Sequence, residues 1–177
     1  AVNPAGDLVA TTLKLAGRTN VSRHPVFQDH LRNGSAALEI SRPLPSAFIG
    51  GQHVHASRRI TENSGRTLGF VDLQMSPRQL LNFTEQANFK PTDLVSGIIL
   101  EGITLGRREG ERVSSGEDLR GRLVMQMQRR SPNGTYLGPS SLDGHVRYFS
   151  HRRLKDFPIF VTAGVSRRTF FEHFANK

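Results

Sequence analysis

The chain has 177 residues, enough for one medium-sized domain or two small ones. Its formal net charge of +9 suits an anionic partner. The arginines, however, are scattered in pairs, and the chain has no Lys/Arg tract and no aromatic nucleic-acid motif, which argues against nucleic-acid binding. The lack of cysteine excludes disulfides, thiolate metal sites and cysteine nucleophiles. No apolar run approaches the ~18–20 residues that cross a bilayer.

The first residues indicate the end of a strand and a turn, Asn3 to Asp7, with no signal-peptide pattern before them. We therefore expect the chain to be a segment of a longer protein.

The first half of the chain predicts hairpins separated by short helices. In chain order, the expected elements are a hairpin around residues 3–7, a helix over 22–31, a strand over 38–40, a hairpin of strands 52–60 and 67–75, and a helix from Ser76 to about Phe89. Ser76 begins the last helix as an N-cap, with Pro77 at the first helical position and Gln79 completing a capping box.

The second half predicts a similar plan. In chain order, we expect a strand–turn–strand within 94–105, a polar loop over 107–117, a strand-like alternation over 123–128, turns at 132–134 and 138–139, a hairpin of 145–151 and 157–165, and a terminal helix over 166–174.

A stretch near the middle of the chain recurs ninety positions later. Residues 70–76 line up with residues 160–166, and an Arg-Arg-apolar step precedes each copy. In the first copy Val71, Leu73 and Met75 share one face of the strand, which we expect to pack inward, while Phe70, Asp72 and Gln74 share the other. The repeat predicts one small α/β module used twice, over residues 1–88 and 89–177.

Two histidines, His53 and His55, lie two apart on a predicted strand and face one side together with Ser57. Such a pair could chelate zinc or copper if Asp72 or His24 supplied a third ligand. The alternatives are that the histidines line a polar pocket or face solvent.

Arg58 interrupts the apolar face of the same strand. A cation in that position needs a carboxylate partner, because an unpaired buried charge is very costly. The partner could be the carboxylate of a ligand or an internal acidic residue.

No catalytic constellation emerges from the sequence. Asp29 with His30, or Asp143 with His145, could form an acid–base pair, but nothing places a nucleophile beside either. We expect no enzyme in this segment.

The order of elements resembles the PAS-like extracytoplasmic Cache fold, and two such units in tandem are similar to the double Cache sensor domain of bacterial membrane receptors. The residues that carry the resemblance are 3–10, 57–60, 65–71, 142–146 and 151–161. It implies an α/β (α+β) fold of two PAS-like modules, each a central antiparallel sheet flanked by helices. The long N-terminal helix of that family has no counterpart here.

By this resemblance, residues 1–88 are the membrane-distal, ligand-binding module and 89–177 the proximal one. Asp72 matches an aspartate of the family's amino-acid-binding version, but the chain has no Trp, so sensing by that motif is not supported. The ligand-binding candidates are Arg58, Asp72, His53, His55, Ser57 and Phe70.

The resemblance implies an extracytoplasmic, periplasmic input domain that binds a small solute, which the basic balance favours as anionic, and that signals to a cytoplasmic output domain. It implies that the chain binds no cofactor, no metal and no nucleic acid. The parent protein would be membrane-anchored, such as a histidine kinase or diguanylate cyclase, and could form a homodimer. The alternatives are a basic nucleic-acid-binding module and a His-x-His metal-binding protein.

Overall fold

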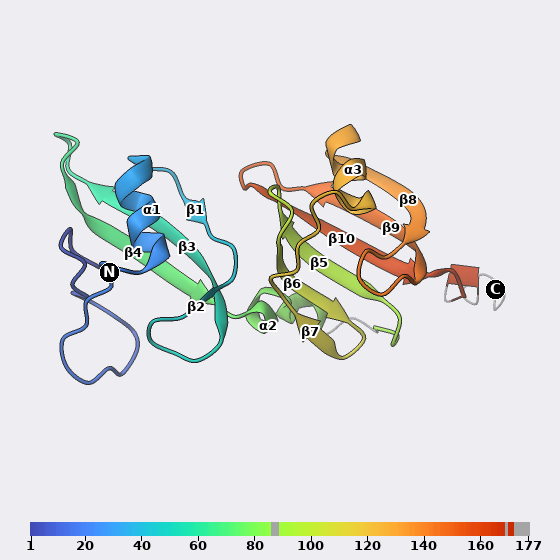
Figure 1. The fold of residues 1–177 in the computed structure, drawn as a ribbon, viewed down its shortest axis with the longest axis horizontal. Helices are drawn as coiled ribbons and strands as arrows, with labels where there is room; N and C mark the ends of the chain where they lie inside the picture. The colour runs from blue at the N-terminus through green and yellow to red at the C-terminus, as the bar shows by residue number, and fades with distance from the viewer. Residues whose placement is uncertain (86–88, 169, 172–177) are drawn as a thin grey trace. The chain divides into compact units, whose positions relative to one another are not determined.

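A computed structural model of the chain describes residues 1–85, 89–168 and 170–171. The chain divides into two compact units, Ala1–Ser76 (unit 1) and Pro77–Lys177 (unit 2) (Figure 1). The division falls earlier than the predicted boundary after residue 88, because the segment that begins at Pro77 packs against strands of unit 2. Leu81 of this segment is buried and lies against Gly106.

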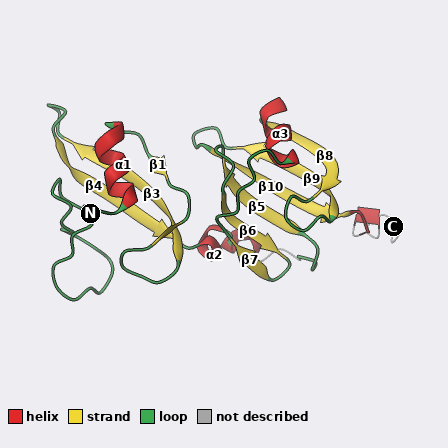
Figure 2. Cartoon of the chain, viewed as in Figure 1, coloured by secondary structure: helices red, strands yellow, loops and turns green. Residues whose placement is uncertain are grey.

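Unit 1 is a small antiparallel sheet with one helix over it (Figure 2). Its elements are α1 (Pro25–Asn33), β1 (Glu39–Ile40), β2 (Leu44–Pro45), β3 (Gln52–Thr61) and β4 (Thr67–Met75). Strand β3 is central and pairs with the other three strands. Pro25 starts α1 with its backbone angle preset, and Gly34 ends the helix in the left-handed conformation that glycine adopts without strain.

The core of unit 1 joins its first residues to β4 and α1. Val2, Phe27 and Phe70 form a buried cluster, in which the two phenylalanine rings meet edge to face with centroids 5.1 Å apart. The backbone N–H and C=O of Phe70 each bond to Val2 at 2.8 Å. Gly69 permits this pairing, because its φ is +155° and a Cβ there would collide with the Val2 carbonyl oxygen.

The two faces of β4 are arranged opposite to the prediction. Phe70 is buried and Asp72 and Gln74 are half-buried, whereas Val71 and Leu73 are 47% and 58% exposed. The prediction assumed that the more apolar face packs inward. In the structure α1 and its neighbouring loops cover the face that carries Asp72, so the polar residues of β4 line the interior of the unit.

Unit 2 is a larger antiparallel sheet with short helices beside it. Its described elements are α2 (Pro77–Leu80), the 3₁₀ turn η1 (Asn82–Thr84), β5 (Leu94–Ile99), β6 (Thr104–Glu109), β7 (Arg112–Ser114), α3 (Leu123–Arg130), β8 (Asn133–Pro139), β9 (Val146–Arg153) and β10 (Ile159–Ser166). The strand order is β7-β6-β5-β10-β9-β8. A buried cluster between α3 and the sheet forms the core: Ile98, Leu119, Val124, Met125 and Phe160.

Three predictions for this unit were wrong. Residues 123–130 form a helix, because Val124, Met125 and Gln128 are the buried positions and their spacing is helical. The polar stretch 107–117 contains the end of β6 and all of β7. The turns predicted at 132–134 and 138–139 fall largely within β8, an edge strand, where proline costs no ladder hydrogen bond.

The helix predicted from Ser76 to Phe89 is shorter, since α2 ends at Leu80 and η1 follows. Its residues 86–88 lie outside the described part of the chain, as do residues 169 and 172–174 of the predicted terminal helix. None of the described helices is long and apolar enough to cross a membrane.

We expect the substitution Phe160→Ala to lower the free energy of unfolding of unit 2 by about 3–5 kcal/mol, because Phe160 has no exposed surface and its removal leaves a core cavity. Urea unfolding followed by circular dichroism would measure this change. The matched control is Phe157→Ala, at a ring that is 42% exposed, which should cost less than about 1 kcal/mol. Equal costs for the two variants would contradict the assigned core.

Candidate ligand-binding site

Unit 1 contains a cavity of about 530 Å³. It lies against the inner face of β3 and β4, and α1 and the segments 8–13 and 47–49 complete its wall. Its wall is mostly apolar, with contributions from Val2, Leu8, Val21, Phe27, Phe48 and Phe70. A volume of this size is in the range of small-molecule sites in proteins.

A few polar side chains interrupt the apolar wall. They are Asp72 and Gln74 of β4, Ser57 of β3, His24 immediately before α1, His30 within α1, and Thr11 and Thr12 of the first loop. No arginine or lysine is among the described residues that line this cavity. Asp72 is therefore the one acidic side chain among the described residues of the lining, and His24 and His30 are the basic side chains there.

The Asp72 carboxylate is only partly satisfied. Its Oδ2 atom lies 2.8 Å from Nδ1 of His55 and accepts a second hydrogen bond from the Gln74 amide at 3.2 Å. Its Oδ1 atom is buried and has no hydrogen-bond partner among the described residues. A buried carboxylate oxygen without a donor is costly, so this position favours a ligand that brings an N–H or O–H group.

Two further histidines lie close to this carboxylate. The Nε2 atom of His30 is 2.8 Å from the Ser57 hydroxyl, and its Nδ1 atom is 3.7 Å from the Glu39 carboxylate. The ring of His24 lies 4.9 Å from that of His55. Both histidines come from the α1 region, which packs over β3 and β4.

The structure brings together four of the six residues that the sequence nominated. Asp72, Ser57 and Phe70 line the cavity, and His55 is fully buried behind Asp72. Strand alternation places Arg58 on the opposite face of β3, where it donates a hydrogen bond to the Ala36 carbonyl oxygen.

His53 is buried beyond the cavity, with its Nδ1 atom 3.4 Å from the Gly51 carbonyl oxygen. In the described part of the chain, no third ligand joins His53 and His55 closely enough to hold a metal ion.

Sequence reasoning missed the contributions of His30, Gln74 and the two loops. His30 follows Val26 and Phe27 at helical spacing, and all three are buried, so the amphipathic pattern of α1 is the signal that would have found it. The two loops give no such signal, because only long-range packing brings them to the sheet and no local pattern in their sequence indicates it.

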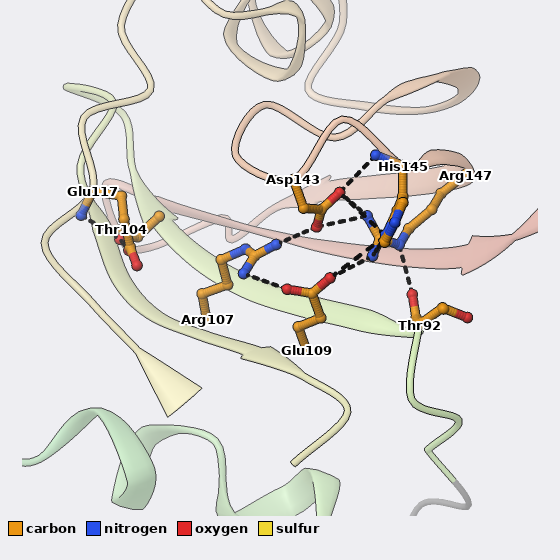
Figure 3. Close-up of polar contacts among 8 residues, drawn as sticks. All are labelled: Thr92, Thr104, Arg107, Glu109, Glu117, Asp143, His145 and Arg147. Carbon is orange, nitrogen blue, oxygen red and sulfur yellow. Dashed lines mark hydrogen bonds and ion pairs between the residues drawn. The ribbon is translucent and has the colours of Figure 1, made fainter. Parts of the chain in front are cut away.

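Unit 2 carries a network of paired charges at the corresponding side of its sheet (Figure 3). Arg147, fully buried, donates to Asp143 at 2.8 Å and to Glu109 at 2.8 Å, and Arg107 donates to the same two carboxylates at 2.7 and 3.0 Å. Glu109, Asp143 and His145 have the spacing of metal ligands. The two guanidinium groups already neutralise the two carboxylates, so the network is better explained as an internal ion cluster.

This network leaves little room beside it. The neighbouring cavity of unit 2 measures about 30 Å³ and is lined by Arg107, Ser96 and Thr162, among others, which is enough space for a single water. Thr162 occupies the repeat position of Asp72. On the inner face of the sheet, unit 1 thus presents a carboxylate to an open cavity and unit 2 a hydroxyl to a nearly closed one.

Solved structures of sensor domains are similar to this chain over most of its length. The extracellular domain of rpHK1S-Z16, named as a histidine kinase, superposes with a TM-score of 0.83 at 24% identity, over 96% of this chain and 70% of that one. The periplasmic sensory domain of the Campylobacter jejuni chemoreceptor Tlp1 superposes with a TM-score of 0.67 at 15% identity, over 86% of this chain and 58% of that one. The ligand-binding domain of the Pseudomonas fluorescens chemoreceptor CtaA, solved with L-leucine, superposes with a TM-score of 0.60 at 14% identity, over 89% of this chain and 65% of that one.

These similarities define a class of fold. The chain has the mixed α/β fold of extracytoplasmic sensor domains from histidine kinases and chemoreceptors, as the resemblance to the double Cache fold predicted. The chain spans 58–70% of the length of these three proteins. No family model and no curated protein matches its sequence.

We expect Arg147→Ala to destabilise unit 2 by about 3–5 kcal/mol, because it leaves two half-buried carboxylates, Asp143 and Glu109, to share the single guanidinium of Arg107. Chemical denaturation would measure the loss. The control is Arg120→Ala, which removes an exposed arginine paired with the exposed Asp118 and should change stability little. A small effect of Arg147→Ala would mean that the network contributes little to the fold.

We also expect acid to weaken unit 2 through Asp143. Burial raises the pKa of this carboxyl, but hydrogen bonds from Arg147 and from the His145 backbone N–H outweigh burial and hold the pKa below its ordinary value. A depressed pKa in the folded state stabilises the protein above pH ~4, and that stability is lost as the pH falls further. The difference in melting temperature between the wild type and Asp143→Asn should therefore narrow from pH 5 to pH 2.5; a constant difference would contradict this assignment.

Proposed function

We propose that the chain is the ligand-sensing input domain of a membrane-anchored signalling protein, located on the extracytoplasmic side, and that unit 1 is its membrane-distal, ligand-binding module. The observation that carries this proposal is the cavity of about 530 Å³ in unit 1, with the partly satisfied Asp72 carboxylate in its wall. The fold shared with sensor domains of kinases and chemoreceptors supports it.

The lining favours a ligand with a cationic or hydrogen-bond-donating group on an apolar body. Asp72 would accept from that group, while Phe27, Phe48 and Phe70 would contact the apolar part. The basic composition of the chain had favoured an anionic solute. The described lining offers such a solute no arginine or lysine and a carboxylate instead, so we assign the opposite charge to the ligand.

Several structural neighbours were solved with amino acids: CtaA with L-leucine, L-alanine or L-isoleucine, and PctB of Pseudomonas aeruginosa with L-Arg. An amino acid carries a carboxylate as well as an amine. Since the chain has no Trp and the described lining has no basic side chain except histidine, a simple amine fits this cavity better than an amino acid.

The signal would leave the cavity through β4. Asp72 and Gln74 contact the ligand from this strand, and the chain passes from β4 into α2 through Ser76. A ligand that binds one arrangement of β4 more tightly would shift the population toward that arrangement. The parent would be a receptor such as a histidine kinase or diguanylate cyclase, acting as a homodimer, with its output domain outside this chain.

A thermal-shift screen of small amines tests the proposal. At a concentration ~100 times its dissociation constant, a bound ligand adds about 2.7 kcal/mol of stability, which raises the melting temperature measurably. Asp72→Asn should abolish the shift, because the amide lacks the charge that the ligand needs. Arg58→Ala is the matched control, on the opposite face of the neighbouring strand, and should keep it. A full shift in Asp72→Asn would exclude Asp72 from the site.

A further inference from the structure

We propose that the cavity of unit 1 binds its ligand in competition with a proton taken up by His55, so that the sensor responds to an amine at neutral or alkaline pH and loses it in acid. This inference concerns the regulation of the site and depends on the proposed amine-binding function. It follows from the arrangement of His55 and Asp72, which share a hydrogen bond in the interior of the unit.

The geometry defines the state of the His55 ring. Nδ1 lies 2.8 Å from a carboxylate oxygen of Asp72, so this nitrogen carries the hydrogen of the bond. In the neutral ring, Nε2 then holds a lone pair, and this atom is buried without a hydrogen-bond partner among the described residues. A proton added at Nε2 places a full positive charge directly beside Asp72.

That charge changes what Asp72 can bind. With a neutral His55, the carboxylate keeps its net negative charge and attracts a ligand cation. With a protonated His55, the pair is neutral, and a second cation gains little from approaching it. Because His55 has 0% of its surface exposed, bulk water screens this effect weakly.

The other charged groups around the pair come from every neighbouring element. From the α1 region, the His24 ring lies 4.9 Å from the His55 ring and His30 lies in the cavity wall. Protonation of either histidine adds positive charge to the cavity. Glu39 of β1 is 3.7 Å from His30 and opposes that effect. On β3, Arg59 donates to the His30 carbonyl oxygen, and His53 lies beyond the cavity.

Imidazole side chains change charge between about pH 5 and 8, the range in which this competition would act. If binding the amine excludes the proton on His55, the affinity for the amine falls by about tenfold for each pH unit below the half-protonation point. A neutral ligand of the same shape makes no such demand. The pH dependence of the affinity should thus require both a charged ligand and His55.

Calorimetric titration with 2-phenylethylamine and its neutral counterpart 2-phenylethanol tests this. We expect the amine to bind at least ~10-fold more weakly at pH 5.5 than at pH 8, with no such change for the alcohol. His55→Gln should reduce the pH dependence of amine binding, whereas His53→Gln, which replaces a buried histidine on the same strand but outside the cavity, should retain it in full. Equal amine affinity at both pH values, or an unchanged dependence in His55→Gln, would overturn the proposal.

Histidine NMR separates this inference from the ligand class. The ring signals absent from His55→Gln identify His55, and adding 2-phenylethylamine at pH 8 should move them if the amine occupies the cavity beside Asp72. If neither compound binds at pH 8, the ligand class fails, and this inference with it. If the amine binds with an affinity that does not change with pH, the ligand class stands and the inference fails.

Discussion

The antiparallel register between β3 and β4 determines which side chains face the cavity of unit 1. It sets Ser57 opposite Asp72 and His55 opposite Gln74, so that the side chains of all four residues point to the same face. A slip of one residue would turn Asp72 to the outside and bring the apolar Leu73 inward. The register is supported where β4 begins, by the backbone pairing of Phe70 with Val2, which requires the glycine at position 69.

The two units use the same sheet position differently. In unit 1, Asp72 faces a cavity and keeps one oxygen without a partner. In unit 2 the equivalent position is Thr162, and the carboxylates nearby are neutralised by Arg107 and Arg147. Buried charges that are fully paired contribute to a defined fold, while one that is partly paired is available to a ligand. At this position of the sheet, unit 1 therefore has a partly paired carboxylate and unit 2 a paired ion cluster.

Strands bounded by clear turns were predictable from sequence. Both hairpins with alternating residues, β3–β4 and β9–β10, form close to the predicted limits, because turn residues and period-two patterns act locally. The strand-like alternation predicted over 123–128 was wrong. A period of two and a helical period both fit its apolar residues, and only the packing of Val124 and Met125 on the sheet selects the helix.

The site was predictable only in part, for a related reason. Asp72, Ser57 and His55 could be nominated because strand alternation groups them. The direction in which that group points depends on where α1 packs, and no local pattern encodes it. His24 and His30 reach the cavity through the same long-range packing. Arg58, nominated for its chemistry, lies outside the cavity because alternation sends it to the other face.

The pairing of Phe70 with Val2 has one more consequence, which concerns main-chain atoms. Along an antiparallel strand, every second residue directs its N–H and C=O to the same side. Phe70 directs these groups away from β3, toward Val2, so Asp72 and Gln74 direct theirs to that same outer edge of β4. Both residues line the cavity, which therefore borders an edge of peptide groups as well as side chains. Main-chain groups do not change when side chains are substituted, so this edge of the cavity keeps its donors and acceptors when the residues at positions 72 and 74 are replaced.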